Sequence, residues 1–108
     1  MTLLSDDLPH ALEAVCEVLQ WAIKDKGPVP YERGSWQGVP DFQRRYRGAM
    51  LRHISDGSKS AKSEGVPFER TRDWETGKLQ LAHIALDALF QLEMVLRDLK
   101  EASEQHEA

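Results

Sequence analysis

Three polar residues lie on one face of the helix that is predicted near the end of the chain. Gln80, His83 and Asp87 follow the spacing i, i+3, i+7, which places side chains on the same side of a helix. An imidazole and a carboxylate that point the same way make a candidate site. The alternative interpretation is structural, with His83 hydrogen-bonded beside the core and Asp87 a solvated charge.

Other carboxylates could complete such a site. Glu13 and Glu17 share a face of the first predicted helix. Asp73 and Glu75 come just before the last one. Carboxylate oxygens are hard ligands that hold Mg²⁺, which in turn holds nucleotide phosphates. The pattern is compatible with phosphate-ester chemistry, although a glutamate pair at i, i+4 is also typical of a solvated helix face.

The basic residues gather in the middle of the chain. Although the formal net charge of the 108 residues is -4, lysine and arginine outnumber the acids between residues 33 and 72. The arginines there that could contact a nucleic acid are Arg44, Arg45, Arg47 and Arg52. The overall acidity argues against a dedicated DNA-binding protein, so we expect no nucleic-acid partner. A compact phosphate ligand explains the local excess better, and a solvated basic helix face is the structural alternative.

The composition, 41% hydrophobic and 30% charged, describes one small globular domain over residues 1–108. No glycine precedes a lysine-serine pair at the spacing of a phosphate-binding loop, and the cysteine and histidines lack the spacing of a zinc site. Cys16 has no partner for an intrachain disulfide and lies among apolar residues, so we expect a buried thiol in a reducing compartment. Without a long apolar run or a signal peptide, we expect a cytoplasmic protein with no membrane contact.

Helical periodicity predicts an all-α fold in which three main helices form a bundle. Asp6 or Asp7 caps the first helix, which stops at Lys26-Gly27-Pro28. Asp41 caps the second helix, which runs to about Ser55. No run with a period of two residues predicts a sheet.

The other segments are predicted to be irregular, apart from the last helix. Residues 28–40 carry several glycines and prolines around Trp36 and predict an ordered loop. Residues 57–72 include many small polar side chains and predict a mobile loop. The last helix is expected to start near Gly77 and to fray over about residues 101–108.

The last helix is apolar over more than half of its circumference. Its apolar residues are Leu81, Ala82, Ile84, Ala85, Leu86, Ala88, Leu89, Phe90, Leu92, Met94, Val95, Leu96 and Leu99. A helix that is apolar nearly all round is buried on several sides, and a chain this short has few other elements to cover it. We therefore expect a second copy of the chain to supply part of the cover, in a homodimer or a higher oligomer.

Several short runs resemble one known family. They are residues 12–19, 50–54, 73–77 and 81–90, together with Trp36. On these runs the chain resembles the dATP/dGTP diphosphohydrolase N-terminal domain family of phage and bacterial proteins, which is related to the MazG-like all-α nucleoside-triphosphate pyrophosphohydrolases. The resemblance covers about residues 9–96. Its most specific pieces are the pair Arg52-His53 and the series Asp73, Glu75, Gly77 and His83. The family has a histidine where this chain has Gln80.

The resemblance implies a cut, dependent on Mg²⁺ or Mn²⁺, between the α and β phosphates of dATP or dGTP, which releases pyrophosphate. The implied metal ligands are Glu13, Glu17, Asp87, Asp73 and Glu75. The implied catalytic residues are Glu17, Glu13, Arg52 and His53. Glu17 or Glu13 would orient the attacking water as general base. Arg52 would stabilise the charge that develops on the phosphates.

The resemblance also implies contacts with the deoxynucleoside triphosphate. His53 and His83 would orient ligands or touch the substrate. Trp36 would stack on the base or fasten the loop, and Arg45 would contact the substrate.

Two other functions stay open. One is a catalytically silent relative that binds a nucleotide or a protein partner. The other is a small helical nucleic-acid-binding protein, whose DNA affinity would fall with salt. Pyrophosphate release that is lost in Glu17→Ala and Asp87→Ala would single out the enzyme.

Overall fold

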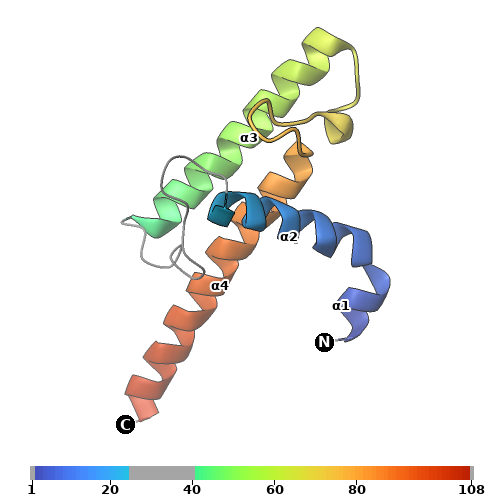
Figure 1. Ribbon diagram of the computed structural model, residues 1–108. Coiled ribbons are helices and arrows are strands. Elements are labelled where there is room, and N and C mark those ends of the chain that lie inside the picture. The colour runs from blue at the N-terminus through green and yellow to red at the C-terminus, as the bar shows by residue number, and fades with distance from the viewer. Residues whose placement is uncertain (1, 25–40, 108) are drawn as a thin grey trace.

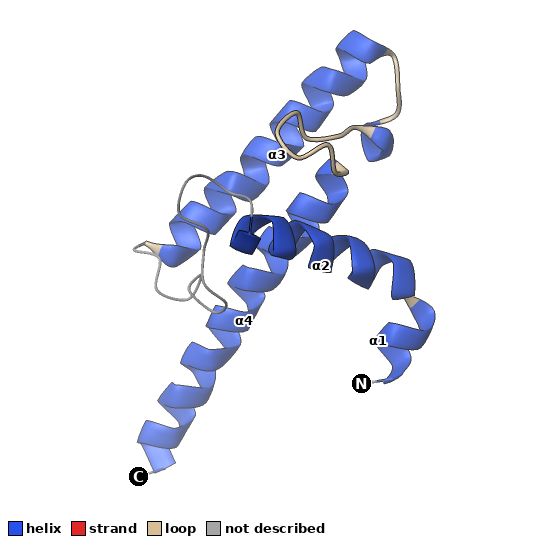
Figure 2. Cartoon of the chain, in the orientation of Figure 1, coloured by secondary structure: helices blue, strands red, loops and turns tan. Residues whose placement is uncertain are grey.

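The structure, a computed structural model, describes residues 2–24 and 41–107, and these are almost entirely helical. The helices are α1 (Thr2–Asp7), α2 (Pro9–Lys24), α3 (Phe42–Glu64) and α4 (Gln80–Glu107), with a short 3-10 helix, η2 (Phe68–Arg70), between the last two (Figure 1). No strand occurs in the described ranges, where Arg72 and Leu79 form a single isolated bridge (Figure 2). The predicted all-α fold is confirmed.

Helices α3 and α4 form the main pair, and α2 packs across α4 (Figure 1). The buried apolar side chains are Val18 of α2 with Ala82, Leu86 and Phe90 of α4. The last three recur at a spacing of four residues, so they form one stripe along α4. The Tyr46 ring of α3 meets the Phe90 ring edge-on at 4.8 Å. This small core holds the start of α4 against both neighbours.

Helix α3 is longer than the sequence predicts. The predicted end at Ser55 is wrong, because the helix continues to Glu64. Of the predicted loop over 57–72, residues 57–64 are therefore helical, and only residues 65–72 lie outside the helix. Gly57 is buried there, and an added Cβ would lie 2.6 Å from the Phe68 ring. The close approach of η2 to the helix explains a glycine that local propensity alone would interpret as a break. The helix ends at Gly65, whose φ of 70° is left-handed and whose N–H bonds the Ala61 carbonyl.

Other predicted boundaries move by a few residues. Asp7 ends α1, so it does not cap the helix that follows. Asp41 does precede α3, but its φ is 53° and its side chain makes no capping hydrogen bond. Helix α4 starts at Gln80, because a turn occupies the residues around Gly77. It then continues to Glu107, so residues 101–107 are helical where fraying was expected.

Two expectations about the surface can be compared with the structure. Cys16 is exposed, so the buried thiol was a wrong prediction; the side of α2 that packs on α4 carries Val18 instead. None of the described helices combines the length and the hydropathy that a membrane span requires. The predicted loop over 28–40, with Trp36, lies outside the described residues.

The C-terminal part of α4 carries a row of exposed apolar side chains. Their exposed fractions are 48% for Leu89, 54% for Leu92, 52% for Leu96 and 62% for Leu99. These four leucines follow the spacing three, four, three, which places them on one side of the helix. We call them the leucine seam. In contrast to the core stripe, the leucine seam is exposed and is not covered by the described residues of its own chain.

Candidate functional site

A tight turn before α4 is organised by one carboxylate. Asp73 Oδ2 accepts hydrogen bonds from the backbone N–H of Glu75 at 3.1 Å and of Thr76 at 3.0 Å, and from the Thr76 hydroxyl at 3.3 Å. The Gly77 N–H bonds the Asp73 carbonyl at 2.8 Å, with a φ of 71° at the glycine. An aspartate whose side chain bonds the backbone two and three residues later is a known way to close a turn.

The same turn is tied to the first residues of α4. The Gln80 N–H bonds the Thr71 carbonyl at 2.9 Å, and the Lys78 N–H bonds Thr76 Oγ1 at 3.2 Å. Thr76 Oγ1 also lies 2.7 Å from His83 Nε2, within hydrogen-bonding distance. The threonine hydroxyl thus links the Asp73 carboxylate to the His83 imidazole.

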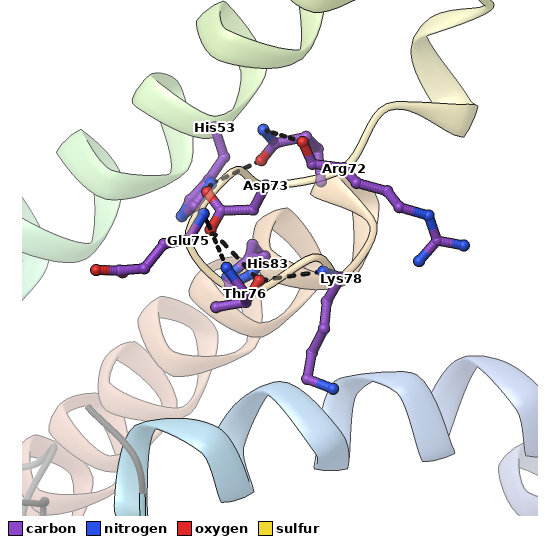
Figure 3. Close-up of polar contacts among 8 residues, drawn as sticks. His53, Arg72, Asp73, Glu75, Thr76, Lys78 and His83 are labelled. Carbon is purple, nitrogen blue, oxygen red and sulfur yellow. Dashed lines mark hydrogen bonds and ion pairs between the residues drawn. The ribbon is translucent and has the colours of Figure 1, made fainter.

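Helix α3 contributes His53 to this arrangement. His53 Nδ1 lies 2.8 Å from Gln80 Oε1 and 3.6 Å from Asp73 Oδ1. Its ring stacks on the His83 ring, with centroids 4.4 Å apart and planes 16° from parallel. Figure 3 shows the two imidazoles and Asp73 meeting between α3 and the start of α4. We call the set His53, Asp73, Thr76, Gln80 and His83 the polar cluster.

The polar cluster is largely shielded from water. The exposed fractions of His53, Asp73, Gln80 and His83 are 7%, 6%, 1% and 7%. Burial, and next the neighbouring His53, lower the pKa of His83 from 6.5 to about 4, although Asp73 opposes the change. His83 is therefore uncharged at neutral pH. In the described part of the chain, every buried side-chain nitrogen and oxygen has a hydrogen-bond partner.

Some of the predicted site residues come together here. His53 lies 3.6 Å from Asp73 and stacks on His83, and Thr76 links Asp73 to His83. Gln80 is the most buried of the residues singled out from the sequence. Asp87 is also buried, one turn beyond His83 on the same face of α4. The polar stripe of α4 therefore faces the protein, as an inward-facing site requires.

Other predicted residues lie outside the polar cluster. Glu13 and Glu17 are exposed on α2, and Glu17 Oε2 lies 3.7 Å from Lys78 Nζ of the turn. Arg45 and Arg52 are exposed on α3. The Glu75 carboxylate is exposed and points away from the cluster in Figure 3.

The carboxylates do not form a ready metal centre within one chain. In residues 2–24 and 41–107, no three histidine, cysteine, aspartate or glutamate side chains are grouped closely enough to hold a metal ion. Asp73 Oδ2 is already engaged by the turn. The residues of the described chain therefore do not fit a resident metal ion held by three or more protein ligands.

Sequence reasoning did not single out Thr76 and Lys78. Thr76 connects Asp73 with His83, and Lys78 reaches toward α2, where it pairs with Glu17 (Figure 3). The signal for Thr76 was present, because aspartate followed three residues later by threonine is typical of a side-chain-closed turn. The pairing of Lys78 had no local signal, since Glu17 is distant in the sequence.

Comparison with known protein families identifies the family of the chain. A family model described as dATP/dGTP diphosphohydrolase, N-terminal, matches residues 1–104. The chain belongs to this family. The resemblance inferred from the short runs is confirmed, and membership in the dATP/dGTP diphosphohydrolase family supports a role in nucleotide hydrolysis. No curated protein and no solved structure matches the chain.

Proposed function

We propose that this protein hydrolyses deoxypurine nucleoside triphosphates, releasing pyrophosphate and the deoxynucleoside monophosphate. One observation carries the proposal. The residues that are most specific to the family resemblance, His53, Asp73 and His83, come from separate segments yet meet in one buried cluster. Titratable groups whose pKa is shifted by burial and by a neighbouring charge, as that of His83 is, cluster at functional sites.

Charged side chains around the polar cluster suit a phosphate ligand. Arg52 is the neighbour of His53 in α3, and Lys78 extends from the turn toward Glu17 of α2. Cations of this kind can attract a triphosphate and stabilise the charge that develops on it during hydrolysis. Glu17 or Glu13 would orient the attacking water as general base.

We propose that the reaction depends on Mg²⁺ bound together with the substrate. Mg²⁺ is commonly held by one or two carboxylates together with substrate phosphates, and it needs no cage made only of protein ligands. We propose that the ion arrives with the nucleotide. This agrees with the lack of a three-ligand group in the described part of the chain.

The experiment is an assay of pyrophosphate release from each of the four deoxynucleoside triphosphates, with Mg²⁺, with Mn²⁺ and with a chelator. We expect turnover of dATP or dGTP that requires the divalent ion. Arg52→Met should lower kcat by roughly 100-fold, the size of effect that follows loss of one group stabilising transition-state charge. Arg70→Met is the matched control, because Arg70 is an exposed arginine of η2 and is not among the residues that form the cluster.

The outcomes separate the three functions. An equal loss of kcat in Arg52→Met and Arg70→Met would mean that turnover depends on positive charge in general and not on Arg52 in particular. Nucleotide binding without turnover would identify a silent relative. DNA affinity that falls steeply with salt and is unchanged in Glu13→Gln would identify a nucleic-acid-binding protein.

We also propose that a second copy of the chain covers the leucine seam. The spacing three, four, three over Leu89, Leu92, Leu96 and Leu99 is that of helices that pack side by side. Four exposed leucines in one row are unusual for a chain whose described apolar core has four residues. Light scattering after size exclusion tests this, because Leu96→Lys should reduce the mass to that of one chain. A wild-type mass of one chain at every concentration would contradict it.

A further inference from the structure

Gln80 is the most buried member of the polar cluster, and it contacts groups on two sides. We infer that Gln80 is a positioning residue for His53; the catalytic consequence of this role rests on the proposed function. It holds the His53 imidazole in the tautomer that carries hydrogen on Nδ1. His53 Nε2 is then a hydrogen-bond acceptor, suited to the attacking water and unsuited to a phosphate oxygen.

The backbone determines which way the Gln80 amide points. Gln80 Nε2 lies 3.5 Å from the carbonyl oxygen of Arg72. A carbonyl oxygen can only accept a hydrogen bond, so the NH₂ group must face it. The opposite orientation would direct Gln80 Oε1 at this carbonyl and set two acceptors against each other. The amide oxygen therefore faces the other side.

On that other side is His53. Gln80 Oε1 lies 2.8 Å from His53 Nδ1, and the side chain is only 1% exposed, so no water can replace the contact. Because an amide oxygen cannot donate, the hydrogen of this bond sits on Nδ1. Asp73 Oδ1, 3.6 Å from the same nitrogen, favours the same tautomer electrostatically. A neutral imidazole carries one such hydrogen, so Nε2 is bare.

The ring itself is held in place. His83 stacks on one face of His53 at 4.4 Å. Gly57, one helical turn after His53, lets η2 and Thr71 approach α3 closely. The stack on His83 and the contact with Gln80 therefore restrict rotation of the His53 ring, as a positioning contact does.

His53 Nε2 remains available. It makes no hydrogen bond with the described residues, and in that part of the chain no buried side-chain nitrogen or oxygen lacks a partner. Nε2 must therefore reach solvent. A bare, solvent-facing imidazole nitrogen binds a donor, such as the O–H of water, whereas a phosphate oxygen offers only lone pairs at neutral pH.

The test reads the tautomer directly. Nitrogen-15 NMR of the imidazole side chains, at about pH 8 where ordinary histidines are neutral, distinguishes a bare ring nitrogen from one that carries hydrogen. We expect His53 to show a bare Nε2 in the wild type and a mixture of tautomers in Gln80→Leu. Gln91→Leu is the matched control, since Gln91 lies on the same helix and bonds the Asp87 carbonyl and Met50.

A wild-type His53 with hydrogen on Nε2 overturns the inference, and this result needs no variant. An unchanged tautomer in folded Gln80→Leu overturns it as well, because Asp73 alone would then hold the ring. In the nucleotide assay, Gln80→Leu should lower kcat by roughly tenfold or more with KM little changed, and Gln91→Leu should change neither. If the wild type hydrolyses no nucleotide, the proposed function fails, while the NMR result still decides the role of Gln80.

Discussion

Helix α4 begins with polar side chains that are buried and ends with apolar side chains that are exposed. At its start, Gln80 and His83 are 1% and 7% exposed, and at its far end Leu96 and Leu99 are 52% and 62% exposed. Both regions contradict the usual preference for apolar interiors and polar surfaces. In each region, other interactions must offset the free-energy cost of this arrangement.

The compensation differs between the two ends. The polar cluster is satisfied within one chain, by the turn around Asp73 and by His53 of α3. The leucine seam has no such cover from its own described residues. The start of α4 is therefore completed by tertiary contacts within the chain, whereas the far end is exposed and is the surface that we propose a second copy covers.

The largest expected loss of stability comes from a substitution in the polar cluster. Asp73→Ala removes the acceptor for two backbone N–H groups and for the Thr76 hydroxyl, in a turn that is partly shielded from water. We expect a loss of about 3 kcal/mol in the free energy of unfolding, measured with urea. Glu75→Ala is the control, because the Glu75 side chain is exposed, and it should cost about 0.5 kcal/mol or less. Similar losses in both variants would show that the turn does not depend on the carboxylate.

A second pair of variants compares the core stripe with the leucine seam. Leu86→Ala, at a position 7% exposed, should cost about 3 kcal/mol. Leu96→Ala should cost less than about 1 kcal/mol in dilute protein, and more as the concentration rises, because a second copy then covers the seam. Denaturation at several protein concentrations measures both. A large cost for Leu96→Ala that does not depend on concentration would mean that its own chain covers this leucine.

Acid should weaken the polar end and leave the leucine seam unaffected. Since the pKa of His83 is lowered from 6.5 to about 4 in the folded protein, the unfolded chain takes up this proton more readily between those values. The contribution of neutral His83 to the free energy of unfolding is then complete above about pH 6.5, and it falls by on the order of 2 kcal/mol as the pH drops toward 4. Unfolding followed over this range measures the slope. It should be shallower in His83→Gln, and an equal slope would assign the effect to other groups.

The smallest expected effect concerns the fit between α3 and η2. Gly57→Ala should cost about 1 kcal/mol, because the new Cβ would meet the Phe68 ring at 2.6 Å. Gly48→Ala, in the same helix with nothing within 4 Å of the new Cβ, should instead stabilise the protein by about 0.5–1 kcal/mol. Thermal unfolding of the two variants compares them. The same sign of change in both would show that Gly57 is not needed for the close approach.

Much of the candidate site could be predicted from the sequence. The spacing of Gln80, His83 and Asp87 correctly placed them on one face of α4, because helical periodicity is a local property. The family resemblance drew attention to His53 and Asp73, which the structure places 3.6 Å apart. The length of α3 could not be predicted, since Gly57 and its serine neighbours read as a break until the packing of Phe68 against the helix is known.

The sequence by itself determined the all-α class, the family and the amphipathic faces of the helices. Only the tertiary structure decided which of those faces meet. It joined His53 to Gln80, 27 positions away, and left Glu13 and Glu17 exposed on α2. The physical reason is that periodicity follows from the geometry of one helix, whereas contact between helices depends on long-range packing and on turns such as the one that Asp73 closes.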